Sequence, residues 1–128
     1  MGKKKILVVD DEKDIVEIIS ELLEGEEYST IAACDGRKAL EIASQEPIDL
    51  IILDIKMPDI DGFGVIEALR DIPSLAGIPI VVLTATQMIQ EIVDRLRKLG
   101  IQICLSKPFE PKDLIGAVAK GLKSGGSH

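Results

Sequence analysis

The sequence predicts an α/β domain in which a parallel β-sheet is covered by helices on both faces. Five β-type runs alternate with five helical patterns along a chain of 128 residues, and three of the runs are continuously apolar. Continuous apolarity is expected of parallel strands that are buried on both faces, and the connections are long enough for helical crossovers. A chain of this length fits one domain. We therefore expect a single doubly wound α/β domain.

The expected strands fall into two kinds. The first, third and fourth runs, Ile6–Val9, Leu50–Leu53 and Ile80–Leu83, are uninterrupted aliphatic segments. The second and fifth, Ser29–Ala33 and Ile101–Leu105, mix polar with apolar residues. Mixed composition suits strands at the edges of a sheet, whereas the aliphatic runs suit its centre.

The expected helices are marked by apolar residues at the spacing of one helical face. The clearest pattern is Ile15, Ile18, Ile19 and Leu22, which has glutamates on the opposite face. Four further stripes follow: Ala39, Leu40 and Ala43; Val65, Ile66 and Leu69; Ile89, Ile92, Val93 and Leu96; and Leu114, Ile115, Val118 and Leu122. Residues expected to end helices or to prevent them before the fourth strand are Gly25, Gly77, Gly100 and Pro79.

Composition excludes several classes of function. The formal net charge is −7 and aromatic residues make up 2% of the chain, which disfavours direct binding to nucleic acid. Cys34 and Cys104 have no metal-binding spacing and the chain has one histidine, so a zinc–thiolate site is not expected. No apolar run is long enough to span a membrane or to act as a secretion signal, so we expect a cytoplasmic protein.

Polar residues follow four of the five expected strands. The first strand is followed by Asp10 and Asp11, the third by Asp54, the fourth by Thr84, and the fifth by Ser106 and Lys107. In a doubly wound sheet the carboxyl ends of the strands form one rim, where ligands bind. We therefore expect these groups to meet at a single site.

The chemistry of this rim suits phosphoryl transfer. Clustered carboxylates repel one another unless a cation lies among them, and ligand sets made only of oxygen favour a hard ion such as Mg²⁺. Lys107 adds a fixed positive charge and Thr84 a hydroxyl donor, which together suit the anionic oxygens of a phosphoryl group. Asp54 is then the expected nucleophile, because carboxylates can form acyl phosphates.

Each of these residues also has an ordinary structural interpretation. Asp10-Asp11-Glu12 is typical of a solvated turn that caps a helix, and Asp54 could cap a loop. Thr84 is a common strand residue, and Lys107 could be a surface charge. The functional interpretation depends on the coincidence of all four at the ends of strands.

These residues lie in motifs that resemble the receiver domain of two-component response regulators. The resemblance spans Lys4 to about Lys123, with the motifs in family order and at family-like spacing. The motifs are Val8-Val9-Asp10-Asp11-Glu12, the segment from Leu50 to Gly62 that contains Asp54, Val82-Leu83-Thr84-Ala85, and Leu105-Ser106-Lys107-Pro108-Phe109.

The resemblance implies a flavodoxin-like fold with strand order 2-1-3-4-5 and five helices, over a receiver domain at 3–123. Residues 124–128 would form a flexible tail or tag remnant. Asp54 would accept a phosphoryl group from a sensor histidine kinase or phosphotransfer protein. Mg²⁺ would bind to Asp10, Asp11, Asp54 and the backbone carbonyl of Lys56. Thr84 and Lys107 would contact the phosphoryl oxygens.

The resemblance also implies details of local structure and of switching. The Lys107–Pro108 peptide would be cis, Met57-Pro58 and Asp61-Gly62 would build the turn beside Asp54, and Gly62 would be free to adopt a positive φ. Phosphorylation would draw Thr84 inward and change the surface of the fourth helix, fifth strand and fifth helix, which would bind a downstream partner. The domain would be a phosphoacceptor rather than an enzyme.

The sequence departs from the family pattern at one switch position. Cys104 stands where the family commonly has Tyr or Phe, so coupling of that side chain to Thr84 cannot take its usual form. Lys56 and Thr86 occupy positions that tune the lifetime of the phosphoryl group, and neither suits orientation of an attacking water. We therefore expect slow self-dephosphorylation. The implied strand order also places Cys34 and Cys104 at opposite edges, too far apart for a disulfide.

Three other functions are compatible with parts of the sequence. A Mg²⁺-dependent phosphatase with an aspartyl nucleophile needs a second Asp two residues later, where this chain has Lys56. A flavin carrier of the same fold needs a hydroxyl- and glycine-rich loop after the first strand, where this chain has acidic residues. A phosphorylation-independent interaction module remains as the alternative, because Cys104 replaces the usual aromatic.

Overall fold

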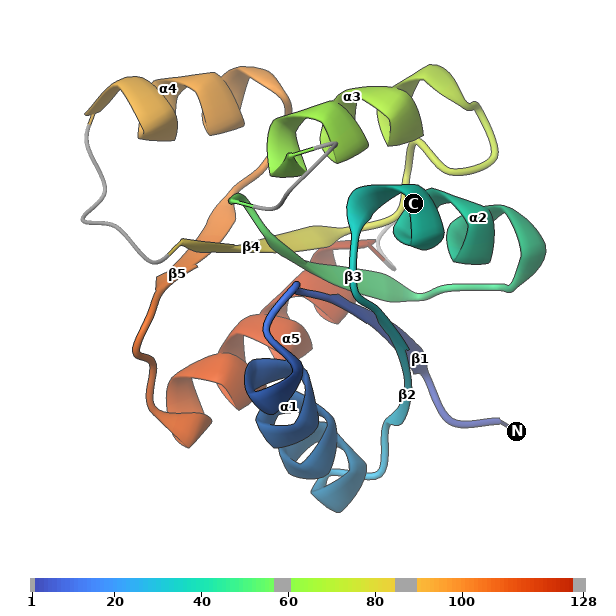
Figure 1. The fold of residues 1–128 in the computed structure, drawn as a ribbon, viewed down its shortest axis with the longest axis vertical. Helices are drawn as coiled ribbons and strands as arrows, with labels where there is room; N and C mark the ends of the chain where they lie inside the picture. The colour runs from blue at the N-terminus through green and yellow to red at the C-terminus, as the bar shows by residue number, and fades with distance from the viewer. Residues whose placement is uncertain (1, 57–60, 85–89, 126–128) are drawn as a thin grey trace.

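A computed structural model of the chain describes residues 2–56, 61–84 and 90–125. Strands and helices alternate throughout, as the sequence predicts (Figure 1). The elements are β1 (Lys5–Val9), α1 (Lys13–Gly25), β2 (Ser29–Ala33), α2 (Gly36–Gln45), β3 (Leu50–Asp54), α3 (Gly62–Asp71), β4 (Ile80–Thr84), α4 (Gln90–Lys98), β5 (Ile103–Ser106) and α5 (Pro111–Gly125).

The strands form one parallel sheet in the order β2-β1-β3-β4-β5. This is the flavodoxin-like topology that the family resemblance implied. The three aliphatic strands β1, β3 and β4 occupy the centre, and the mixed strands β2 and β5 lie at the edges. The prediction of central and edge strands from their composition is therefore confirmed.

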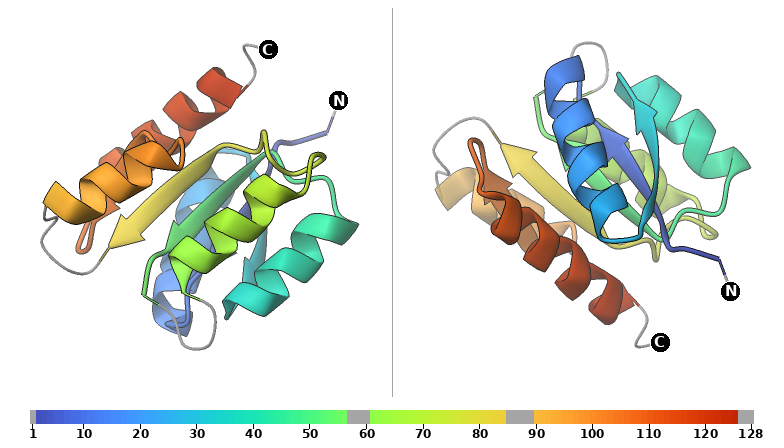
Figure 2. Two further views of the ribbon diagram at one scale, coloured as in Figure 1. Left: turned by 90° about the horizontal axis from the view of Figure 1, so that it is seen from above. Right: turned by 90° about the horizontal axis from the view of Figure 1, so that it is seen from below.

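Helices cover both faces of the sheet and create two separate cores. Helices α1 and α5 lie on one face, and α2, α3 and α4 on the other (Figures 1 and 2). Alternate residues of each central strand serve the two cores: Ile6 and Val8 point toward α1 and α5, whereas Leu7 and Val9 point toward α2 and α3. Side chains buried on both faces explain why β1, β3 and β4 are uninterrupted aliphatic runs.

The buried face of α1 differs from the predicted stripe. Val16, Ile19 and Leu23 are its buried residues, whereas Ile18, which was expected to be buried, is 49% exposed. The spacing of isoleucines alone was ambiguous, because apolar residues occur on more than one side of this helix. Packing against the sheet selects the face that includes Val16 and Leu23.

Several predicted boundaries move by a few residues. β5 begins at Ile103 rather than Ile101, although Ile101 is buried just before it. α3 ends at Asp71, so Gly77 does not end that helix but lies in the turns that follow it. α5 extends from Pro111 to Gly125.

The cysteines lie as predicted from the strand order. Cys104 is in edge strand β5, and Cys34 directly follows β2 at the opposite edge. Both are free cysteines.

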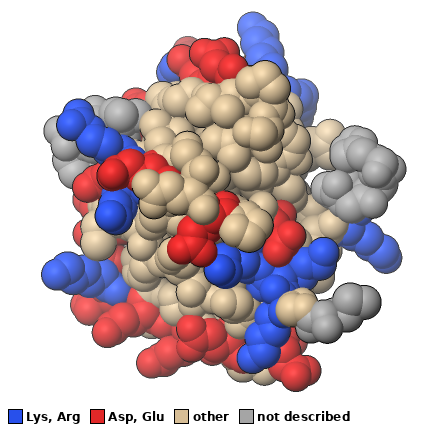
Figure 3. Space-filling model, turned by 90° about the vertical axis from the view of Figure 1, so that its right-hand side faces the viewer, with Lys and Arg blue, Asp and Glu red and all other residues tan. Residues whose placement is uncertain are grey.

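The face of the molecule drawn in Figure 3 has a largely uncharged upper centre, with charged side chains below it and along its edges. On the face that lies to the right in Figure 1, basic and acidic side chains are interspersed and neither sign covers the surface (Figure 3). Among the described residues no helix is both long and apolar enough to cross a membrane.

Candidate functional site

The carboxyl ends of β1, β3, β4 and β5 form the predicted polar rim. Asp10 follows β1, Asp54 is the last residue of β3, Thr84 is the last residue of β4, and Lys107 follows β5. The side chains of Asp10, Asp54 and Thr84 are almost fully buried, with exposed fractions of 0%, 3% and 3%. Buried polar groups at the ends of aliphatic strands are costly unless they are paired, so their partners define the site.

Lys107 joins the acidic groups of this rim. Its Nζ lies 2.7 Å from Asp10 Oδ2 and 3.3 Å from Asp54 Oδ2, and its side chain is 9% exposed. Burial lowers the pKa of the ammonium, but the hydrogen bond and charge of Asp10 and then the charge of Asp54 outweigh it and raise the pKa above its ordinary value. Lys107 is therefore a fixed positive charge at neutral pH.

The Asp54 carboxyl is harder to ionise than an isolated aspartate, although Lys107 lies beside it. Burial and then the charge of Asp10 raise the pKa of Asp54 to about 6, against the opposing effects of Lys107 and of the Lys56 backbone N–H. That N–H donates to Asp54 Oδ1 at 3.2 Å. An additional cation near Asp54 and Asp10 would stabilise the ionised form of both buried carboxylates.

The remaining acidic groups provide oxygen ligands for such a cation. One carboxylate oxygen from each of Asp10, Asp11 and Glu12 lies within 4.8 Å of the others. Asp10 is buried and the other two are exposed, so this cluster joins the interior of the site to solvent. An all-oxygen donor set beside the acidic pair Asp10–Asp54 fits a hard divalent ion.

Glu12 has a contact that the sequence did not predict. Its Oε1 lies 3.4 Å from Lys107 Nζ, and its backbone N–H donates to Asp10 Oδ1 at 3.0 Å. From the sequence, Glu12 was expected only as part of an acidic turn. Its position directly after two aspartates at a strand end was the available signal.

A hollow of about 610 Å³ opens beside the rim, between the β3–α3 region and α4. Lys56 and Asp11 line it on the side of the rim, and Arg95 lines it from α4. The Arg95 guanidinium lies 3.9 Å from the centre of the Phe63 ring, which is buried on α3. The lining of this hollow beside the rim therefore contains both signs of charge, and the Phe63 ring supports the Arg95 guanidinium.

A model of the response regulator receiver domain matches residues 6–119 of this chain. The chain belongs to this family. It is a receiver domain.

Relatives and solved structures agree with this assignment. The probable transcriptional regulator ycf27 of Cyanophora paradoxa is 41% identical over 125 residues, covering 96% of this chain and 50% of that protein. Response regulator GtcR of Aneurinibacillus migulanus is 37% identical over 120 residues, covering 94% of this chain and 48% of that protein. The chain thus spans about half the length of these curated relatives. The chemotaxis protein CheY4 of Vibrio cholerae superposes with a TM-score of 0.87 at 32% identity, covering 94% of this chain and 99% of that one.

Within this receiver domain, one glycine has a different role from the one expected. Gly62 does not have a positive φ, so that prediction is wrong. A Cβ at this position would lie 2.7 Å from Ile55 Cα and 2.8 Å from the Asp54 carbonyl oxygen. Glycine is needed there because the start of α3 packs directly against the backbone that follows the phosphoacceptor candidate.

Other local predictions have mixed outcomes. The Lys107–Pro108 peptide is cis, as predicted. Asp61 caps α3, accepting a hydrogen bond from the Gly64 backbone N–H at 2.9 Å. The predictions for Met57, Pro58, Thr86 and Ile89 lie outside the described residues.

Cys104 lies at the position expected from the family motif, in β5. It is half-buried, and burial raises the pKa of its thiol. It lines a hollow of about 290 Å³ together with Val93, Leu96 and Arg97 of α4. The surface between α4 and β5 is therefore hollowed beside this small side chain.

Proposed function

We propose that this receiver domain takes a phosphoryl group onto Asp54 from a phosphohistidine of a sensor histidine kinase or phosphotransfer protein. The observation that carries the proposal is the position of Lys107, whose ammonium lies within hydrogen-bonding distance of the carboxylates of both Asp10 and Asp54. A cation held between the candidate nucleophile and a second carboxylate can stabilise the negative charge that develops on a phosphoryl group during transfer. Membership of the family supports the choice of donor.

The proposed transfer is a direct displacement at phosphorus. A carboxylate oxygen of Asp54 attacks the phosphorus atom, and the bond from phosphorus to the imidazole nitrogen breaks. The electron pair of that bond remains on the nitrogen of the donor histidine. The product is an acyl phosphate on Asp54. With a pKa of about 6, the Asp54 carboxyl is mostly ionised at pH 7 and is therefore available as a nucleophile.

Asp10, Asp11, Asp54 and the Lys56 backbone carbonyl are the residues that we propose to hold Mg²⁺. When bound, Mg²⁺ would neutralise negative charge on the carboxylates and on the phosphoryl oxygens. From its position beside Asp54, the Lys107 ammonium would bind a phosphoryl oxygen. Thr84, at the end of β4, would donate a hydrogen bond to another phosphoryl oxygen through its hydroxyl. The domain is then a phosphoacceptor that assists its own modification rather than an enzyme.

We propose the surface of α4, β5 and α5 as the surface that changes on phosphorylation and binds a downstream protein. Helix α4 has nine residues, and Leu96 is the buried residue in it. A small buried surface therefore holds this helix against the rest of the domain. Thr84 ends β4, and the next described element is α4, so a shift at Thr84 leads directly to that helix. Cys104 cannot supply the aromatic rotamer coupling typical of the family, so the coupling would depend on Thr84 and on the packing of α4. The setting of such a system is cytoplasmic.

Incubation with Mg²⁺ and acetyl phosphate followed by intact-mass measurement tests the proposed function. We expect one phosphoryl adduct that is labile to hydroxylamine and absent without Mg²⁺. The adduct should be lost in Asp54→Asn and retained in Asp71→Asn, which changes an exposed carboxylate at the end of α3. An adduct that persists in Asp54→Asn would assign the chemistry to another residue. Absence of any adduct would favour the phosphorylation-independent interaction module.

The adduct should be lost slowly once the phosphodonor is removed. Lys56, which follows Asp54 by two residues, is exposed and carries no acid or amide that could orient an attacking water. We expect Lys56→Gln to shorten the lifetime of the adduct, measured by intact mass over time. A native half-life of seconds would contradict this prediction.

A further inference from the structure

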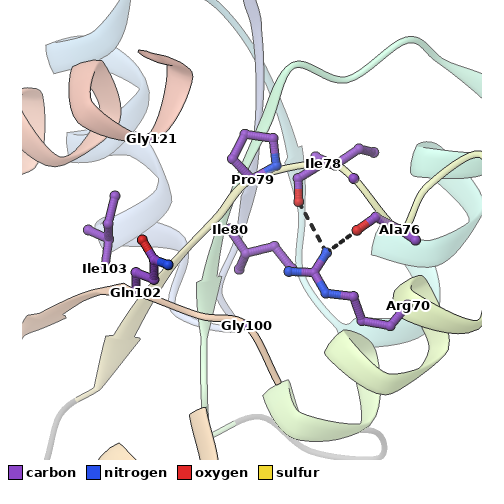
Figure 4. Close-up of a pocket in the computed structure, with 10 residues that line it drawn as sticks. Arg70, Ala76, Ile78, Pro79, Ile80, Gly100, Gln102, Ile103 and Gly121 are labelled. Carbon is purple, nitrogen blue, oxygen red and sulfur yellow. Dashed lines mark hydrogen bonds between the residues drawn. The ribbon is translucent and has the colours of Figure 1, made fainter. Parts of the chain in front are cut away.

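A separate hollow of about 340 Å³ lies at the amino ends of β4 and β5, opposite the end of the sheet that holds Asp54. It is bounded by Arg70 from the last turn of α3 and by Gln102 and Ile103 at the start of β5 (Figure 4). The family motifs in the sequence do not include these residues. The volume lies in the range of small-molecule sites.

The Arg70 side chain is fixed in the wall of this hollow by main-chain carbonyls. Its Nη1 donates to the Ala76 and Ile78 carbonyl oxygens at 2.5 and 3.3 Å, and its Nε donates to the Leu99 carbonyl oxygen at 3.4 Å. Within the described residues, Nη2 donates no hydrogen bond. It points away from the two bonded carbonyls, toward Ile80 (Figure 4). The guanidinium is thus held in place with one terminal nitrogen presented to the hollow.

The positive charge of Arg70 has no anionic partner in the described part of the chain. No described carboxylate lies within 4 Å of it, in contrast to Lys107. Burial lowers the pKa of Arg70, which indicates that the protein solvates this cation less well than water does. A bound anion would supply the missing compensation, and guanidinium groups are well suited to carboxylates.

The rest of the hollow combines one polar group with aliphatic walls. The Gln102 amide lies across from Arg70, and Pro79, Ile80 and Ile103 form apolar sides (Figure 4). Gly77, Gly100 and Gly121 also line it, and their lack of side chains helps to keep the space open. Arg70 Nη2 and the Gln102 amide nitrogen each carry two N–H donors, and the single positive charge with a small apolar wall matches a ligand that has one negative charge and an aliphatic part.

We propose that this hollow binds a carboxylate carried on a short branched aliphatic group. The carboxylate would lie between Arg70 Nη2 and the Gln102 amide, and the aliphatic group would pack on Pro79, Ile80 and Ile103. Such a carboxylate is offered by a free organic acid and by the end of a peptide chain that finishes in leucine. The few contacts available indicate a dissociation constant of about 1–10 mM.

Titration of the intact protein with isovalerate, followed by NMR of the Gln102 side-chain amide and the Arg70 Nε–H, tests the proposal. We expect saturable shifts at both groups at constant ionic strength. Isovaleramide, the neutral isostere, should bind at least about tenfold more weakly than isovalerate, since it lacks the negative charge. N-acetyl-leucine separates the two sources: tighter binding than isovalerate assigns a peptide end, and weaker binding assigns a free acid.

Two variants with matched surroundings locate the site. Gly77→Leu should abolish binding, because Gly77 lines the hollow and an added Cβ meets no atom within 4 Å, so the side chain can enter without disrupting the fold. Gly116→Leu is the control: its Cβ also meets no atom within 4 Å, but Gly116 does not line the hollow. Gln102→Leu should weaken binding by about tenfold.

Four results would overturn the proposal. The first is the absence of saturable shifts with isovalerate, and the second is equal binding of isovalerate and isovaleramide. The third is unchanged binding in Gly77→Leu. Tighter binding of inorganic phosphate than of isovalerate would also overturn the assignment to a carboxylate.

Discussion

The two ends of the sheet each hold a cation that is partly or largely removed from water. The charged form of this cation is stabilised at one end and destabilised at the other. At the carboxyl end, Lys107 is surrounded by Asp10, Asp54 and Glu12, and its pKa is raised. At the amino end, Arg70 is held by three carbonyl oxygens, and its pKa is lowered by burial. Hydrogen bonds fix both side chains, but only formal negative charge offsets the cost of burial.

The two cations therefore have different roles. Lys107 belongs to a cluster of carboxylates that suits phosphoryl transfer, whereas Arg70 holds main-chain carbonyls together and keeps a positive charge that no described carboxylate offsets. Around Lys107 the acidic groups outnumber the cation, and burial together with the charge of Asp10 raises the pKa of Asp54 to about 6. Around Arg70 the balance is reversed, because the described residues supply no carboxylate to it. The first end therefore favours an added cation and the second an added anion.

The largest expected effect comes from removing the cation at the carboxyl end. Lys107→Met should lower the free energy of unfolding by about 2–4 kcal/mol at pH 7 without Mg²⁺, because it leaves the buried carboxylates of Asp10 and Asp54 unpaired. Urea unfolding measures this change. Mg²⁺ should restore more stability to this variant than to the native protein. A variant as stable as the native protein would show that Lys107 does not offset these charges.

The second expected effect has the opposite sign. Asp54→Asn should raise the free energy of unfolding by about 1–3 kcal/mol at pH 7 without Mg²⁺, since each unit of pKa shift corresponds to about 1.4 kcal/mol. The pKa of Asp54 is about 6 in the folded protein and 3.8 without its surroundings, so the native protein loses stability relative to the variant as pH rises through this interval. The gain should therefore shrink as pH falls from 7 toward 4.

Urea unfolding of Asp54→Asn at several pH values measures this trend. The control is Asp71→Asn, in which the carboxylate is exposed and the difference from native should be small at every pH. A gain at pH 4 as large as that at pH 7 would contradict the electrostatic explanation.

A smaller effect is expected from removing the cation at the amino end. Arg70→Gln should lower the free energy of unfolding by about 1–2 kcal/mol, because it removes hydrogen bonds to the Ala76, Ile78 and Leu99 carbonyls. Since no described carboxylate pairs with Arg70, this loss should be similar at pH 5 and pH 8, and insensitive to Mg²⁺. Arg97→Gln, on the exposed side of α4, provides the control. A strong pH dependence would indicate an acidic partner for Arg70.

The smallest effect concerns the exposed member of the acidic cluster. Glu12 is 61% exposed at its side chain and lies 3.4 Å from Lys107. Glu12→Gln should change the free energy of unfolding by about 0.5 kcal/mol or less, and high salt should remove even this difference. A loss comparable to that of Lys107→Met would place Glu12 among the residues that hold the cation.

Much of the fold could be predicted because its signals are local. Three aliphatic runs identified the central strands β1, β3 and β4, and mixed composition identified the edge strands β2 and β5. The polar residues at the strand ends could be assigned to one rim, because parallel strands direct their carboxyl ends to the same side. The prediction failed for Ile18, since apolar spacing along α1 does not say which of two overlapping faces meets the sheet.

The sequence by itself determined which groups reach the rim, because each of Asp10, Asp54, Thr84 and Lys107 is delivered by the end of its own strand. Only the tertiary structure decided how those groups pair, why Gly62 must lack a side chain, and that Glu12 contacts Lys107. It also decided that Arg70 faces a hollow in which none of the described residues supplies a carboxylate to it. These features depend on distances between segments far apart in the chain, and such distances are set by the packing of helices on the sheet rather than by the order of residues.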